Sequence, residues 1–151
     1  MDRSEGTVLL VEDDANDVML TARAFEQAGF VNPLQVVPDG EAAIAYLSGE
    51  GRYADRQRYP FPILLLLDLK LPRVSGFEVL AWLRAVPDIR RLPVIVLTSS
   101  EQSPDINRAY DQGANSYLVK PVEFDDLKEM IEKFHIYWVD LNAKPTLPAQ
   151  G

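Results

Sequence analysis

The chain has 151 residues and no cysteine, with 47% hydrophobic residues, 25% charged residues and a formal net charge of −8. These values are typical of one globular domain that is long enough to bury a sizeable core. They exclude disulfides, thiol catalysis and zinc–thiolate sites, and the negative field argues against nucleic acid and anionic membranes as direct partners. The longest apolar run, residues 61–67, is too short to span a bilayer. The N-terminus also lacks the apolar core of a signal peptide, so we expect a cytoplasmic protein.

Short apolar segments alternate with helical patterns along the chain. The predicted strands cover residues 7–11, 34–37, 63–67, 93–97 and 117–119. The predicted helices cover residues 15–28, about 40–47, about 75–83, 104–112 and a long final stretch from residue 123. The helical segments carry apolar side chains three and four residues apart, whereas the third and fourth strands are apolar at every position, as strands buried on both faces are.

This alternation predicts a fold of the α/β class. Strands that alternate with helices form a parallel sheet with right-handed crossovers and helices on both faces. We therefore predict one doubly wound, five-stranded, flavodoxin-like domain over residues 1–151. Ligands of such sheets bind at the carboxyl ends of the strands, so the residues that follow each strand are the candidates for function.

Polar side chains stand at four of these strand ends. Glu12 and Asp13 follow the first strand, Asp68 ends the third, Thr98 ends the fourth and Lys120 follows the fifth. Each of these residues, taken alone, is explained more simply by a structural role than by a function. Acids at strand ends, for example, often cap the next helix, as Asp14 can here. Their convergence at one edge of the inferred sheet is what favours a functional site.

The charges of this set point to a metal and a phosphoryl group. Glu12, Asp13 and Asp68 together carry −3, and carboxylates held close together destabilise one another. A Mg²⁺ ion (or Mn²⁺) and Lys120 would contribute +3, and Mg²⁺ prefers oxygen ligands of this kind. A carboxylate can act as a phosphoryl-accepting nucleophile, while a metal, a lysine and a hydroxyl stabilise the transferring oxygens.

Four segments of the chain, "LLVEDD", "LLLLDLKLPRVSGFE", "VIVLTSS" and "GANSYLVKP", resemble the receiver domain of two-component response regulators over about residues 7–133. The resemblance implies that Asp68 accepts a phosphoryl group from a phosphohistidine of a sensor histidine kinase. It also implies that Glu12, Asp13 and Asp68 hold Mg²⁺ together with the backbone carbonyl of Lys70. Thr98 and Lys120 would then contact the phosphoryl oxygens.

The same resemblance implies further roles. Tyr117 matches the aromatic residue that reorients with Thr98 on activation, although simple packing of a strand aromatic is the alternative. The bond between Lys120 and Pro121 matches one that is usually cis in the family. Lys70 and Ser100 occupy positions that tune hydrolysis of the phosphoryl group.

Two segments exceed a minimal receiver. Residues 49–62 contain three arginines and two tyrosines. We expect a solvated loop or an extension of the preceding helix here, in preference to a binding site. We expect residues 134–151 to form a C-terminal extension without an output domain, and Pro145, Pro148 and the last residues are typical of a frayed end. An insertion and tail of this kind resemble single-domain regulators paired with phytochrome-type sensor kinases.

The final helix carries two apolar stripes. The first is predicted to face the sheet and consists of Phe124, Leu127, Ile131, Phe134 and Trp138. The second consists of Met130, Tyr137 and Leu141, which either lie against a neighbouring helix of the same domain or form a partner surface. Because receivers commonly dimerise through the face made by helix four, strand five and helix five, we predict a homodimer there.

Three functions compete. The leading one is a phosphoacceptor switch that catalyses only its own phosphorylation and dephosphorylation and signals by altered protein binding. A Mg²⁺-dependent phosphohydrolase of the haloacid-dehalogenase type would need a second aspartate two residues after the nucleophile, where this chain has Lys70. A pseudo-receiver that binds partners without phosphorylation is disfavoured by the intact acid, threonine and lysine set.

Overall fold

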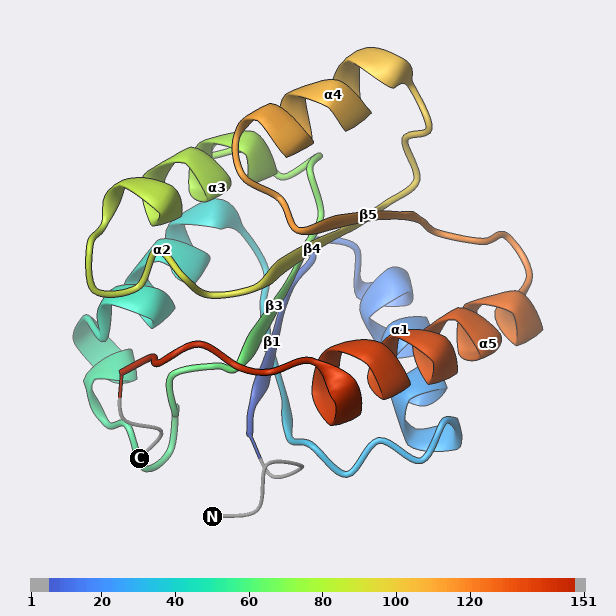
Figure 1. The fold of residues 1–151 in the computed structure, drawn as a ribbon, viewed down its shortest axis with the longest axis horizontal. Helices are drawn as coiled ribbons and strands as arrows, with labels where there is room; N and C mark the ends of the chain where they lie inside the picture. Colours follow the sequence, from blue (N-terminus) through green and yellow to red (C-terminus); the bar gives the residue numbers. More distant parts are fainter. Residues whose placement is uncertain (1–5, 149–151) are drawn as a thin grey trace.

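The computed structural model describes residues 6–148, which form one parallel sheet with helices on both faces (Figure 1). The strands follow the order β2-β1-β3-β4-β5. Their bounds are Val8–Val11 for β1, Leu34–Val37 for β2, Leu64–Leu67 for β3, Val94–Thr98 for β4 and Ser116–Val119 for β5. The predicted doubly wound fold is confirmed, and the strand order reverses between β1 and β3, beside the candidate residues.

The helices lie close to their predicted positions. Their bounds are Ala15–Gln27 for α1, Gly40–Ser48 for α2, Gly76–Ala85 for α3, Ser103–Asp111 for α4 and Phe124–Phe134 for α5. The side chains of Asp14, Asp39 and Ser75 accept hydrogen bonds at the N-termini of α1, α2 and α3, which satisfies donors that the first helical turn leaves free. The predicted capping role of Asp14 is therefore confirmed.

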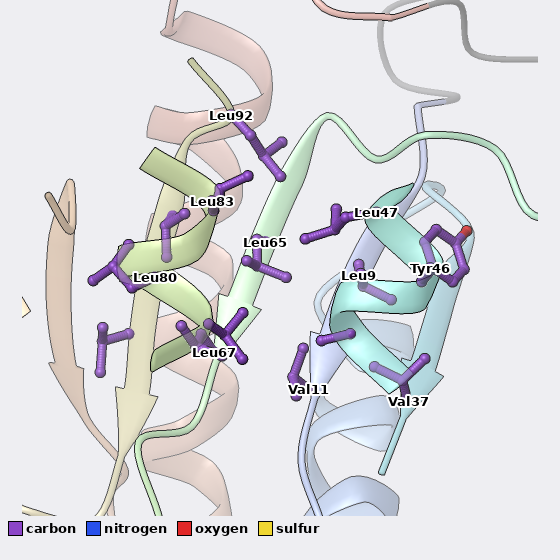
Figure 2. Close-up of a cluster of buried hydrophobic side chains, with 14 of the residues drawn as sticks. Leu9, Val11, Val37, Tyr46, Leu47, Leu65, Leu67, Leu80, Leu83 and Leu92 are labelled. Atoms are coloured by element: carbon purple, nitrogen blue, oxygen red, sulfur yellow. The ribbon is translucent and has the colours of Figure 1, made fainter. Parts of the chain in front are cut away.

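Two hydrophobic clusters hold the layers together. Alternate residues of β1 and β3 point to opposite faces of the sheet, so Leu9 and Leu65 pack with α2 and α3 (Figure 2), whereas Leu10 and Leu66 pack with α1 and α5. This is why the central strands are apolar at every position. The stripe predicted to face the sheet from the final helix is confirmed, since Leu127 is buried and Phe124 packs against the same cluster.

Residues 49–62 fold onto the domain rather than extend into solvent. They contain a short 3₁₀ helix, η2 (Gly51–Ala54), and Tyr59 and Phe61 are buried. Arg56 donates hydrogen bonds to the carbonyl oxygens of Tyr46 at 2.7 Å and Leu47 at 3.1 Å, at the C-terminal end of α2. The insertion is therefore attached to α2 by burial and by helix capping. A short helical turn follows α2, and the expectation of a solvated loop is wrong for the buried Tyr59 and Phe61.

The C-terminal extension is also ordered as far as residue 148. After α5 the chain continues as a π-helix, η3 (His135–Leu141), and residues 142–148 then run back across the domain towards α2 and α3 (Figure 1). Leu147 packs against the cluster formed with those helices. The expectation of a frayed end is wrong for Pro145 and Pro148 because this apolar contact anchors the segment; the last three residues lie outside the described part. Within residues 6–148, no helix is long and apolar enough to cross a membrane.

Candidate functional site

Asp68 follows β3 at the centre of the sheet and ends a run of four buried leucines. Its residue exposure is only 7%, yet its carboxylate is hydrogen bonded. The hydroxyl of Thr98 donates to Oδ1 at 2.9 Å, and the backbone N–H of Lys70 donates to the same oxygen at 3.3 Å. These partners offset part of the cost of burying a carboxylate, so Asp68 ends the apolar strand among polar partners at the edge of the core.

Lys120 joins the neighbouring acids. Its ammonium Nζ contacts a carboxylate oxygen of Glu12 and lies 3.2 Å from Asp17 Oδ2 and 3.3 Å from Asp68 Oδ2. The backbone N–H of Lys120 donates to the carbonyl oxygen of Thr98 at 2.7 Å, which places this residue beside the end of β4. The structure thus brings Glu12, Asp68, Thr98 and Lys120 together, as the sequence predicts.

Asp17 is a further acid of this site that was not predicted from the sequence. This residue lies in the first turn of α1, after the N-cap Asp14, and it supplies a third carboxylate to Lys120. No local pattern marks this contact, because Lys120 lies more than 100 residues away in the chain.

The acids also satisfy the requirements of a divalent cation. Glu12, Asp13 and Asp68 each offer a carboxylate oxygen, and these oxygens lie within 4.8 Å of one another. Asp13 is exposed, whereas the other two are buried, so the cluster opens to solvent on one side. Hard oxygen donors in this number fit Mg²⁺ or Mn²⁺, which retains several waters. The role of the Lys70 carbonyl in this set stays a prediction.

Negative charge exceeds positive charge in the site. Burial raises the pKa of Glu12 to about 7, an effect that the hydrogen bond from Lys120 opposes and the charge of Asp68 reinforces. Burial by itself lowers the pKa of Lys120, but its hydrogen bond to Glu12 and the charges of Asp68 and Glu12 raise that pKa overall. Lys120 therefore stays an ammonium at neutral pH, and a bound cation would lower the pKa of Glu12.

Tyr117 lies on the α4 side of β5. Its hydroxyl donates to the carbonyl oxygen of Ser100 at 2.8 Å, and the hydroxyl of Ser100 donates to Asp105 Oδ2 at 2.5 Å. Its ring also packs against the cluster of α2 and α3, in agreement with the packing interpretation. The side chain is thus tied to the loop between β4 and α4, and its reorientation with Thr98 stays a prediction.

One prediction about this site is wrong. The bond between Lys120 and Pro121 is trans, as are the other peptide bonds of residues 6–148. The trans form is the lower in energy for a bond to proline by roughly 0.5–1 kcal/mol. With this bond trans, Nζ of Lys120 already lies within contact of Glu12, Asp17 and Asp68.

A doubly wound domain with a buried aspartate at the end of its central strand, flanked by an acid pair, a threonine and a lysine, belongs to the class of aspartate-centred phosphoacceptors. The chain is a member of the response regulator receiver domain family, whose model matches residues 8–132. Phosphorylation on an aspartate is the general function of receiver domains.

Individual relatives agree with this assignment. The "Probable methanogenesis regulatory protein FilR2" of Methanothrix harundinacea is 43% identical over 141 residues, which cover 91% of this chain and 86% of that protein. The phosphorylated cyanobacterial phytochrome response regulator RcpA superposes with a TM-score of 0.86 at 34% identity, covering 94% and 99% of the two chains. The Mn²⁺-bound form of response regulator Rcp1 superposes with a TM-score of 0.83 at 35% identity, covering 93% and 99%.

Proposed function

We propose that Asp68 accepts a phosphoryl group from the phosphohistidine of a sensor histidine kinase in a reaction that requires Mg²⁺ or Mn²⁺. The observation that carries this proposal is the position of Asp68. Its Oδ1 lies 2.9 Å from the Thr98 hydroxyl, and its Oδ2 lies 3.3 Å from the Lys120 ammonium. After transfer, the same hydroxyl and ammonium would contact the phosphoryl oxygens. A cation held by Glu12, Asp13 and Asp68 would supply charge neutralisation at those oxygens.

Replacement of the acceptor tests this proposal directly. Asp68→Asn keeps the size of the side chain but removes the nucleophile, so labelling by phosphorus-labelled acetyl phosphate with Mg²⁺ should be abolished. Asp111→Asn, an exposed acid at the end of α4, removes the same charge and should be labelled like the wild type. An acid-stable label that persists in Asp68→Asn would place the phosphoryl group on a serine or threonine and contradict the proposal.

The kinase that donates the phosphoryl group is proposed to be of the phytochrome type. RcpA is a cyanobacterial phytochrome response regulator, and the likeness to it covers 94% of this chain and 99% of that chain. Incubation with a phytochrome-type kinase and with an unrelated histidine kinase, each prephosphorylated with labelled ATP, tests the pairing. Faster transfer from the unrelated kinase would contradict it.

Signal output is proposed to use a homodimer through α4, β5 and α5. Leu118, Met130, Tyr137 and Trp138 line a groove of about 730 Å³ between β5 and α5, and Tyr137 and Leu141 are 56% and 71% exposed. Their exposure argues against the alternative in which the second stripe lies against the chain's own helices. Exposed apolar groups of this size favour a protein partner.

Sedimentation velocity measures this association. The wild type at tens of micromolar should contain dimers in at least one phosphorylation state, and Met130→Glu/Tyr137→Glu should be monomeric because two buried charges would be left unpaired. Lys128→Glu/Glu132→Lys exchanges charges on α5 outside the residues that line this groove, and serves as the control. A wild type that stays monomeric in both states refutes the dimer, as does a dimeric Met130→Glu/Tyr137→Glu variant.

Two observations disfavour the competing functions, a phosphohydrolase and a pseudo-receiver. The second aspartate that a phosphohydrolase of the haloacid-dehalogenase type needs is replaced by Lys70, whose side chain is exposed. A pseudo-receiver would not need the contacts that bring Thr98 and Lys120 to Asp68. Both observations support the phosphoacceptor switch.

A further inference from the structure

The loop between β3 and α3, residues 68–75, carries the acceptor and the Lys70 carbonyl, and it contains an unusual backbone position. Arg73 has φ of +62°, the only positive φ at a residue other than glycine within residues 6–148. A side chain with a Cβ disfavours this left-handed conformation. Something in the surrounding structure must therefore hold Arg73 in place.

Two carboxylates at the N-terminus of α2 hold it. Arg73 donates from Nη2 to Asp39 Oδ2 and from Nε to Glu41 Oε1, both at 3.1 Å. Asp39 is fixed in turn, because its other oxygen accepts from the backbone N–H of Ala42 at 2.7 Å as the helix cap. The guanidinium thus bridges two acids from one helical terminus, a geometry that a planar fork of donors suits.

Close backbone packing joins the same two elements. A Cβ on Gly40 would lie 2.3 Å from the carbonyl oxygen of Val74, and a Cβ on Gly76 would lie 2.2 Å from the carbonyl oxygen of Asp68. The backbone N–H of Gly76 donates to the carbonyl oxygen of Leu69 at 3.0 Å. The loop is therefore closed on itself at its base and pressed against α2 near its far end.

We propose that the α2 clamp, made of Asp39, Gly40, Glu41 and Arg73, positions the loop so that Asp68 and the Lys70 backbone are ready to bind the divalent cation. Arg73 is a positioning residue, since its own contacts are with Asp39 and Glu41 and not with the acceptor. The proposal rests on the proposed function, in which that cation is required. Released from the clamp, the loop would have to be ordered on binding, and the cost would appear as weaker cation affinity.

Arg73→Gly is the sharpest variant because it removes both ion pairs while relieving the backbone strain. We expect Mg²⁺ to bind roughly fivefold more weakly in calorimetric titration of the metal alone, the scale of one or two exposed ion pairs. The Mg²⁺ concentration that half-saturates labelling by acetyl phosphate should rise by the same factor. The labelling rate at saturating Mg²⁺ should stay within about twofold of the wild type, since the positioning cost is then overcome.

Gly40→Ala reaches the same loop by a different route, because the added methyl pushes Val74 away while leaving Arg73 and its acids intact. It should weaken Mg²⁺ binding as well. Arg91→Ala removes the same charge from an exposed turn before β4, at the opposite edge of the sheet, and should bind Mg²⁺ like the wild type.

The outcomes separate the two proposals. If Arg73→Gly and Gly40→Ala both bind Mg²⁺ within twofold of Arg91→Ala, the clamp has no positioning role, although the phosphoacceptor function stands. A lower maximal rate with an unchanged Mg²⁺ dependence would likewise overturn it, as this would be general damage to the site. A wild type that neither binds Mg²⁺ nor becomes labelled would overturn the proposed function together with the clamp.

Discussion

Removal of divalent cations should make the stability of this protein fall as the pH rises, and Glu12 should be the cause. Burial raises the pKa of Glu12 from 4.5 to about 7. Between these two values the folded state therefore binds more protons than the unfolded state, and the free energy of unfolding decreases with increasing pH. The loss begins near pH 4.5 and is complete above pH 7, with Lys120 charged throughout because its pKa is raised.

The magnitude follows from the same values. A rise from 4.5 to about 7, at about 1.4 kcal/mol for each pH unit, corresponds to roughly 3 kcal/mol of stability lost between pH 4.5 and pH 8. Glu12→Gln removes the titrating group, and the interaction of the ionised carboxylate with Lys120 is already included in the raised pKa. The difference in unfolding free energy between Glu12→Gln and wild type should therefore shift in favour of the variant by about 3 kcal/mol.

Urea unfolding followed by tryptophan fluorescence provides the assay, in a chelating buffer at several values between pH 5 and pH 8. Comparing the two proteins cancels the titration of the other carboxylates. With millimolar Mg²⁺ the wild-type dependence should flatten, because a bound cation favours the ionised form of Glu12. Wild-type and Glu12→Gln curves that run parallel from pH 5 to pH 8 without metal would refute the reasoning.

Four further substitutions should have distinct effects. Asp13→Ala should abolish most Mg²⁺ affinity in calorimetric titration, whereas Asp14→Ala should retain that affinity and lose about 1 kcal/mol of stability through its helix cap; equal losses of affinity would mean that the ligands are misassigned. Lys120→Ala should stay folded by circular dichroism but respond poorly to phosphorylation, and a response equal to that of the wild type would reduce Lys120 to a structural lysine. Leu147→Ala should lower the free energy of urea unfolding by about 1 kcal/mol, because truncating a half-buried leucine costs less than truncating a fully buried one. Unchanged stability would show that the segment after η3 does not stabilise the domain by packing.

The sequence alone was sufficient for the fold and for most of the site. Strands buried on both faces must be apolar throughout, so the apolar pattern of residues 64–67 and 94–97 predicts such strands. Parallel strands connected by helices bring their carboxyl ends to one edge of the sheet. Asp68, Thr98 and Lys120 follow from that geometry. Their proposed roles depend on chemistry that is local to each side chain, which a linear pattern preserves.

Tertiary structure alone decided the features that depend on contacts between distant residues. Asp17 joined the site because α1 presents it to Lys120, more than 100 residues away in the chain. The tail is ordered because Leu147 meets helices α2 and α3, and Arg73 adopts its backbone conformation only where Asp39 and Glu41 can hold it. Such contacts stabilise the protein only after folding has brought distant residues together, so no local sequence pattern predicts them.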